Sequence, residues 1–307
     1  MARYIQKRLM TAVIVTLGVS FLVFMMVNLL PGDATSVMLA EFGASAEQQE
    51  ELRRQLGLDR PIMERYWDFL VNALQGDLGR SLFTRRRVVA QILEQYPATF
   101  QLALAGMSVA IAFGSIFGVT AAVNRGKLLD TGTMFAALLA VSMPSFWLGL
   151  VFIFVFAVRL GWLPTSGTAS WRHLVLPAFA IGLRSAGVLA RLVRSSMLEV
   201  LRQDYITTAR SKGVTERVVI WRHALKNALI PVVTVVGIQF GYLLGGTVIT
   251  EIVFARQGIG NLIINAIFKH DFPLVQGGVL VLAVVFVFVN LMVDLTYGFL
   301  DPRVRYD

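Results

Sequence analysis

The sequence contains no cysteine among its 307 residues, and only 15% of its residues are charged. Without cysteine there are no disulfides, and cysteine usage says nothing about the redox compartment. The scarcity of charge, together with 56% hydrophobic residues and a mean hydropathy of +0.67, excludes an ordinary soluble globular domain. We therefore expect lipid to surround most of the chain.

Motifs that carry chemistry are also lacking. No Gly-x-x-x-x-Gly-Lys-Ser/Thr segment occurs, so no phosphate-binding loop of that type is present. The three histidines, His173, His223 and His270, are too scattered to suggest a metal site, and no Ser/His/Asp arrangement stands out. The sequence thus predicts a chain that is not an enzyme and holds neither a metal nor a cofactor of its own.

Hydrophobic runs long enough to cross a bilayer are abundant. A spanning helix needs about 20 apolar residues, and five charge-free windows meet this length: residues 9–32, 95–124, 131–158, 227–250 and 272–293. A sixth, residues 173–193, is interrupted by Arg184 and Arg191. Because lipid leaves each backbone N–H and C=O to be paired within its own segment, all six are expected to be helices. The predicted fold class is an all-α integral membrane protein, with the first span kept as an anchor.

The basic residues indicate the orientation. Fifteen lysines and arginines fall in the N-terminal tail, the second and fourth connections and the C-terminal tail, against four in the two short connections on the other side. Such an excess marks the cytoplasmic face, so both termini are predicted to be cytoplasmic. The net charge of +9 follows this distribution, and we predict no nucleic-acid partner.

The long connection between the first two spans is predicted to lie outside and to contain helices. Ser45 and Gln48 form a capping-box pattern for a helix through Leu56, and Pro61 suits the first turn of another. That second helix would place Ile62, Tyr66, Phe69 and Leu70 on one face, with Trp67 beside them. A turn at residues 76–79 and an amphipathic lead-in at 88–95 would follow. The region either shields the helix bundle or docks an external partner. The expected division is residues 1–96, anchor plus external region, and 97–307, a five-helix core.

Small residues and prolines mark the spans. Rows of small residues at a spacing of four predict close helix packing. They comprise Gly106, Ala110, Gly114, Gly118 and Ala122 in one span and Gly237, Gly241 and Gly245 in another.

Pro144 and Pro177 each remove one backbone hydrogen bond and are expected to bend their helices. Kinks at membrane depth point to a pathway, so Ser142 and Pro144 are candidate pathway residues. Arg184 is another, because an unpaired guanidinium facing lipid costs at least about 2.5 kcal/mol; it meets either cargo or a partner subunit.

The fourth connection, within residues 194–228, reads as two helices separated by a break. Leu198, Leu201, Tyr205 and Ala209 recur at spacings of three and four and predict an apolar stripe. Gly213 predicts a left-handed helix end, after which Thr215 and Glu216 begin the second helix. A protruding helix with apolar and charged faces suits contact with another protein, although lipid headgroups would also attract its basic residues.

These residues resemble a known family. Ala209-x-x-x-Gly213 before a membrane helix is similar to the "EAA loop" of permease subunits in binding-protein-dependent ABC importers, and the wider pattern resembles the B-type subunit of the dipeptide/oligopeptide branch. The matching segments in this sequence are Arg194-Ser195-Ser196-Met197, Asp204-Tyr205, Thr208-Ala209-Arg210-Ser211-Lys212-Gly213, His223-Ala224-Leu225-Lys226-Asn227-Ala228, Gly76-Asp77-Leu78-Gly79-Arg80-Ser81, Gly161-Trp162-Leu163-Pro164 and Asp301-Pro302-Arg303. Gln257 stands where that branch usually has proline.

The resemblance implies a type I ABC importer permease fold with six transmembrane helices in the bacterial cytoplasmic (inner) membrane. It implies as partners a homologous second permease, two cytoplasmic ABC ATPases that bind ATP and magnesium, and an external or periplasmic solute-binding protein. The coupling residues it implies are Asp204, Tyr205, Thr208, Ala209, Arg210, Ser211, Lys212, Gly213, Val214 and Arg217. Short peptides are the expected cargo, with nickel complexes, glutathione or oligosaccharides as alternatives. An ion-coupled secondary transporter is the alternative from another class, and it would be expected to bury ion ligands at the membrane midplane.

Overall fold

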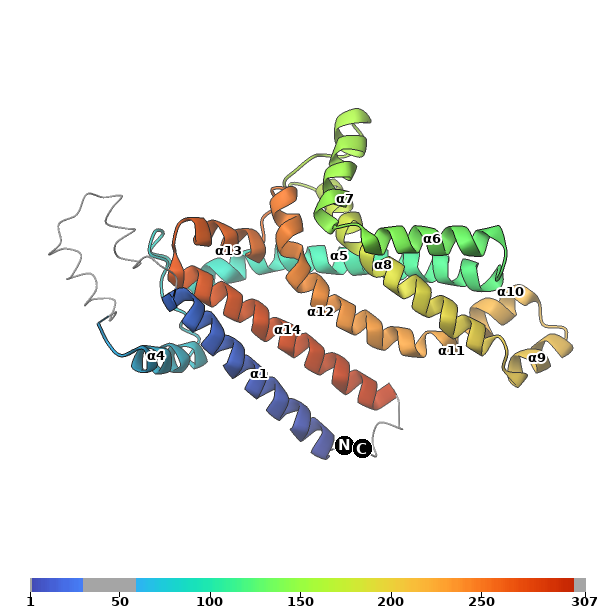
Figure 1. Cartoon of the computed structure of the whole chain (residues 1–307), viewed down its shortest axis with the longest axis horizontal. Coiled ribbons are helices and arrows are strands. Elements are labelled where there is room, and N and C mark those ends of the chain that lie inside the picture. The colour runs from blue at the N-terminus through green and yellow to red at the C-terminus, as the bar shows by residue number, and fades with distance from the viewer. Residues whose placement is uncertain (1, 30–58, 301–307) are drawn as a thin grey trace. The chain divides into compact units, whose positions relative to one another are not determined.

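The computed structural model describes residues 2–29 and 59–300 (Figure 1). Helices make up nearly all of the regular structure in these two ranges. In chain order they are α1 (Ala2–Leu29), α4 (Ile62–Leu74), α5 (Val88–Val123), α6 (Leu128–Ser142), α7 (Ser145–Phe152), the π-helical η1 (Ile153–Arg159), α8 (Arg172–Val200), α9 (Asp204–Ser211), α10 (Glu216–Val218), the π-helical η2 (Val219–Ala224), α11 (Leu225–Ala228), α12 (Ile230–Val253), α13 (Ile259–Phe268) and α14 (Phe272–Leu300).

The predicted spans correspond to helices. Five described helices are long and apolar enough to cross a bilayer, namely α1, α5, α8, α12 and α14. A sixth span results if α6 and α7 with η1 are counted as one broken segment. The interrupted sixth window is confirmed as α8, which is also the span whose apolar stretch is most buried. Arg184 and Arg191, the arginines that interrupt the window, are nevertheless both exposed in this chain.

The third predicted span is broken and not merely kinked. α6 ends at Ser142, and α7 begins at Ser145 after a bend of 105° at Met143 and Pro144. Proline disfavours helical geometry in the residue before it, and Met143 has an extended backbone, with ψ of 132°. By contrast, α8 continues through Pro177 to Val200 without interruption.

The described part of the connection between the first two spans contains the helix, turn and lead-in that the sequence predicted. The lead-in at 88–95 is continuous with the second span in α5, and α4 begins directly after Pro61. In α4 the predicted apolar face is half-buried, while Trp67 is exposed. Gly76 and Gly79 both have φ of +80°, as the predicted turn requires. The capping-box helix at 45–56 lies outside the described residues.

Contacts group the described residues into two compact units. Residues 2–5, 99–256 and 289–300 form the first unit, and residues 6–29, 59–98 and 257–288 form the second. The helices α5 and α14 each contribute residues to both. The division of the chain at residue 96 that we drew from the sequence stays a prediction.

In the first unit, α8 is the central helix and contacts α6, α7, α11 and α12. It also packs against α5, where a Cβ added to Gly114 or Gly118 would lie within 2.7 Å of Leu189 or Val193. A Cβ on Gly182 would come within 2.5 Å of the Gly106 carbonyl oxygen. The glycine row of α5 is therefore confirmed as a packing surface. In α12, Gly237 packs against Val293, whereas a Cβ on Gly245 would meet nothing within 4 Å in this chain, so the role of Gly245 in helix packing stays a prediction.

Two buried charged residues, one in the last turn of α12 and one just after it, are hydrogen-bonded to α5 within the first unit. Glu251 is fully buried and accepts a hydrogen bond from Thr99 Oγ1 at 2.6 Å. Arg256 is also buried, and its guanidinium donates to Gln101 Oε1 at 3.1 Å. Burial lowers the pKa of Arg256 from its ordinary value. These bonds give each of the two buried charged groups a hydrogen-bond partner, which reduces the cost of burying it.

Gly187 provides a test of the packing around α8. We predict that Gly187→Ala destabilises the protein by about 1–3 kcal/mol, because the new Cβ would lie 2.4 Å from the Ala137 carbonyl oxygen of α6. The melting temperature of the purified protein in detergent measures the effect. Gly132→Ala, in α6, is the matched control: it meets nothing within 4 Å and should leave stability unchanged or raise it by about 0.5–1 kcal/mol. Equal melting temperatures for the two variants would contradict the close approach of α6 and α8.

Candidate functional site: an exposed loop and a cavity

The helix α9 ends in a defined hydrogen-bonded motif. Gly213 N–H donates to the Arg210 carbonyl at 3.0 Å, and Val214 N–H donates to the Ala209 carbonyl at 3.3 Å. This pair of bonds is the Schellman arrangement, in which the residue after the helix cap is left-handed. Gly213 has φ of +78°, so the predicted left-handed end is confirmed. Ala209 and Gly213, the two residues of the loop motif, are thus both parts of one helix terminus.

The predicted apolar stripe across Leu198 and Tyr205 is wrong. The first helix does not run through the segment, because α8 ends at Val200 and α9 begins only at Asp204. The break rotates the second part, so that Ile206 is fully buried while Tyr205 is 42% exposed. The prediction had assumed one continuous helix from Leu198 to Ala209.

An ion pair connects the two sides of the Gly213 break. Arg210 Nη2 and Nε donate to the two carboxylate oxygens of Glu216 at 2.6 and 3.1 Å. These hydrogen bonds hold the pKa of the Glu216 carboxyl below its usual range. Because both side chains are largely exposed, the pair orients the loop more than it stabilises the fold.

The predicted coupling residues form an accessible surface. Ala209 and Val214 are half-buried, and the others are exposed, namely Asp204, Tyr205, Thr208, Arg210, Ser211, Lys212, Gly213 and Arg217. The hydroxyls of Thr208 and Ser211 donate to the carbonyls of Asp204 and Thr207, one turn earlier. The loop therefore presents a short helix with a charged outer surface, as expected of a segment that contacts another protein.

The coupling loop is also joined to the helix that follows it. Asn227 Nδ2 of α11 donates to the Tyr205 hydroxyl of α9 at 2.7 Å. Only Leu229 separates α11 from α12, and α9 contacts η2, which precedes α11. A displacement of α9 would thus reach the first turn of α12.

A second ion pair lies where α8 approaches the loop. Arg194 donates to both carboxylate oxygens of Asp130 at 2.6 and 2.7 Å, in the parallel two-bond geometry that arginine favours. Asp130 is 8% exposed and also accepts a hydrogen bond from Gly126 N–H at 3.0 Å. This pair ties α6 to the last turns of α8.

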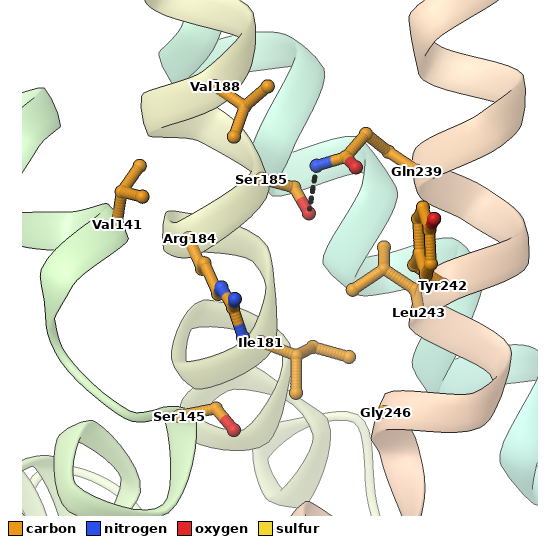
Figure 2. A pocket seen from close by; sticks show the side chains of 10 residues that line it. All are labelled: Val141, Ser145, Ile181, Arg184, Ser185, Val188, Gln239, Tyr242, Leu243 and Gly246. Atoms are coloured by element: carbon orange, nitrogen blue, oxygen red, sulfur yellow. Dashed lines mark hydrogen bonds between the residues drawn. The ribbon is translucent and has the colours of Figure 1, made fainter.

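A cavity with both apolar and polar lining residues lies between α8, α12 and the broken span (Figure 2). Its volume is about 330 Å³, and its lining residues are Val141, Ser145, Ile181, Arg184, Ser185, Val188, Gln239, Tyr242, Leu243 and Gly246. Gln239 Nε2 donates to Ser185 Oγ at 3.3 Å across the cavity. Figure 2 shows Arg184 extending from α8 toward Ser145, with Gln239 and Tyr242 on the facing side of α12. No carboxylate is among these lining residues.

The three candidate pathway residues differ in position. Arg184 lines the cavity, and it makes no hydrogen bond or ion pair with any residue in the described ranges. Ser142 and Pro144 do not line it, but their neighbours Val141 and Ser145 do. The Ser142 hydroxyl donates to the Leu138 carbonyl of its own helix at 2.9 Å. The break therefore shapes the cavity through its flanking residues.

Sequence reasoning missed several of the residues that build these sites. Glu216 was assigned only a helix start, and Asn227, Gln239 and Tyr242 were assigned no role. The pairing of Arg210 with Glu216 could have been found, since opposite charges flank a predicted turn. The Tyr205–Asn227 bond joins residues 22 positions apart and has no local signal.

The arrangement defines a multi-pass membrane subunit with a cavity between its helices and an exposed loop that is hydrogen-bonded to the segment leading into α12. The sequence matches the family described as "Binding-protein-dependent transport system inner membrane component" over residues 114–306, and its N-terminal counterpart over residues 1–103. The chain therefore belongs to this family. It is a permease subunit of an ABC importer and not an enzyme in itself, which decides against a secondary transporter.

Curated relatives cover the whole chain. The di/tripeptide transport system permease protein DppB of Pseudomonas aeruginosa is 42% identical over 100% of this chain and 99% of the relative. The glutathione transport system permease protein GsiC of Escherichia coli K12 is also 42% identical, over 100% of both chains.

Solved structures support the fold. An inward-facing structure of the MetNI methionine ABC transporter superposes with a TM-score of 0.56 at 21% identity, covering 69% of this chain and 96% of that one. A second crystal form of the same transporter gives a TM-score of 0.57 at 20% identity, covering 68% and 96%. The chain thus has the type I importer permease fold predicted from its sequence.

Gly213 provides a test of the loop geometry. Its added Cβ would meet nothing within 4 Å, so a substitution acts through the backbone conformation alone. We predict that Gly213→Ala destabilises the loop terminus by about 1–2 kcal/mol, seen as roughly 5- to 30-fold faster amide hydrogen exchange in residues 209–216. Gly213→Asn is the matched variant, because asparagine tolerates left-handed geometry, and its exchange should remain close to wild type. Unchanged exchange in the alanine variant would contradict the motif.

Proposed function

We propose that this chain is the permease subunit of a bacterial inner-membrane importer for short peptides. A homologous permease would complete the pathway, an external solute-binding protein would deliver peptide, and two cytoplasmic ATPases would bind ATP and magnesium. The names of the relatives support peptide cargo. The observation that carries the proposal is the exposed α9 with its Schellman terminus and its hydrogen bond to α11.

The coupling loop would act as a mechanical connection. An ATPase that grips α9 moves Tyr205, and the bond to Asn227 passes that displacement through α11 to α12. Because α12 carries Gln239 and Tyr242, the displacement changes the cavity wall opposite Arg184. To invert a two-state population from 1:99 to 99:1 takes about 5.5 kcal/mol of differential binding, which explains why ATP is needed.

The cavity would receive the peptide during translocation. Arg184 offers a charged donor to a peptide carboxylate or to main-chain carbonyls, and no carboxylate in the lining opposes an anionic group. Ser142 and Pro144 would contribute by setting the break that places Ser145 at the cavity. The alternative role for Arg184 is an ion pair with the partner permease.

Glutathione is the second candidate cargo, favoured by the GsiC relative at the same identity. It carries carboxylates that the same arginine would bind. Nickel complexes and oligosaccharides are further cargoes of this architecture, and competition for uptake of a labelled dipeptide distinguishes all of these.

A crosslink tests the coupling role. Because the chain has no cysteine, Ser211→Cys or Val214→Cys gives a single thiol. We predict a crosslink from either residue to a co-expressed ATPase subunit carrying a cysteine in its surface groove, with a yield that changes when ATP is added. Ser166→Cys, an exposed serine in the connection between η1 and α8, is the control and should give none. Equal yields at residues 166 and 211 would sink the coupling role.

A cycle of variants and peptides tests Arg184. Loss of a charge-assisted hydrogen bond costs about 1.5–3 kcal/mol, so Arg184→Gln should reduce uptake of dialanine at least tenfold. The same variant should change uptake of alanyl-alanine amide much less. The binding protein discriminates between the two peptides equally in the wild-type and the variant importer. Its contribution therefore cancels when the ratio of the two uptake rates is compared between them. Arg191→Gln, an exposed arginine two turns further along α8, is the control and should not alter the ratio. Unchanged uptake in Arg184→Ala together with weaker copurification of the partner permease would establish the alternative role.

A further inference from the structure

A tight turn in the second unit gathers four arginines. Residues 80–87 read Arg-Ser-Leu-Phe-Thr-Arg-Arg-Arg, and all four arginines are exposed. Arg86 forms an ion pair with Glu94. Arg80, Arg85 and Arg87 form none with the residues that the structure describes. Arg80 belongs to a segment that resembles the family, but neither that resemblance nor the coupling mechanism accounts for Arg85, Arg86 and Arg87.

The turn is held by hydrogen bonds within its own backbone. Arg85 N–H donates to the Ser81 carbonyl and Ser81 N–H to the Arg86 carbonyl, both at 3.0 Å. Arg80 and Arg87 pair across its base as an antiparallel bridge. Arg85 has φ of +58°, a left-handed conformation that an arginine adopts only when its surroundings impose it.

A buried carboxylate anchors the turn to the rest of the unit. Asp271 is 2% exposed, and its two oxygens accept hydrogen bonds from Ser81 Oγ at 2.5 Å and from Leu82 N–H at 3.1 Å. Ser81 Oγ in turn accepts from Thr84 N–H at 3.0 Å. Val88, directly after the turn, is fully buried in a cluster with Ile92 and Ile259. The arginines therefore project from a fixed support, and little conformational entropy is lost when a partner binds them.

The chemistry of the turn selects the partner. All four cations are arginines, whose planar fork suits carboxylates as well as phosphates. The charge distribution of the sequence predicts that this turn lies on the outer side, whereas the attraction of juxtamembrane basic segments to anionic lipid acts chiefly at the cytoplasmic leaflet. A protein surface rich in Asp and Glu is therefore favoured over a membrane surface.

We infer that the turn at residues 80–87 is the docking surface for an acidic face of the external solute-binding protein. This inference rests on the proposed function for the identity of the partner. The fixed arginines steer the approach of the binding protein and set its orientation over the permease. Attraction between exposed charges is screened at distances beyond about 8–10 Å at physiological salt, so binding weakens as ionic strength rises.

The test measures equilibrium binding without ATP. The assembled importer is placed in nanodiscs of phosphatidylcholine, and its own binding protein, fluorescently labelled, is titrated at 50 and 200 mM KCl. For the wild-type importer the dissociation constant should rise about tenfold between the two salt concentrations. Arg85→Asn with Arg87→Gln should weaken binding roughly 5- to 20-fold at 50 mM and flatten the salt dependence, since each surface pair contributes about a two- to fivefold factor. Asparagine at residue 85 tolerates the left-handed backbone.

Two matched variants complete the design. Arg125→Gln with Lys127→Gln removes two exposed charges from another connection and should bind as wild type. Arg85→Lys with Arg87→Lys keeps the charge and should retain the salt dependence. A wild-type affinity that does not respond to salt would overturn the inference, and so would equal losses in both charge-removal variants. A loss in the Asn/Gln variant that appears only when phosphatidylglycerol is present would assign the turn to lipid and also overturn it. Because no ATP is used, failure of peptide uptake alone would count against the proposed function and not against the docking surface.

Discussion

The close approach of helix backbones to α8 is the constraint on which the first unit depends. Gly182 and Gly187 let the backbones of α5 and α6 come so near that an added Cβ would lie 2.4–2.5 Å from a carbonyl oxygen. In lipid there is no hydrophobic driving force between helices, so the van der Waals energy of such close contact holds them together. Because α8 carries Arg184 into the cavity and ends next to the coupling loop, one packing interaction positions both parts of the site.

The loop that carries the predicted coupling residues is rigid and yet exposed. Hydrogen bonds fix its helix end, and the Arg210–Glu216 pair crosses the break, yet nearly all the outer side chains are accessible. A partner can therefore move the loop as one body. The Tyr205–Asn227 bond passes that movement to α11, and α12 follows after a single residue. Spatial continuity of this kind makes coupling possible, but only a measurement of the effect of ATP on the loop can show that coupling occurs.

The turn at residues 80–87 resembles the loop around Gly213 in how it presents charged side chains. Each segment has a left-handed residue, Gly213 or Arg85, and each places charge on a support held by hydrogen bonds. They differ in the anchor. Asp271 buries a carboxylate to hold the arginine turn, whereas the coupling loop buries Ile206 and pairs its charges at the surface.

The sequence by itself determined the apolar spans and the class of protein. Hydrophobic length located every span, because lipid forces each backbone polar group to be paired locally, and Gly213 marked the helix end, because few other residues accept a left-handed backbone. The tertiary structure alone decided the rest. It set the bend of 105° at Met143 and Pro144 and the rotation that buries Ile206 in place of Tyr205. It also formed three pairs between residues far apart in the chain, namely Asp130–Arg194, Tyr205–Asn227 and Ser81–Asp271. Contacts of this kind depend on how helices pack, and helix packing is set by the shapes of many side chains at once, which no local pattern records.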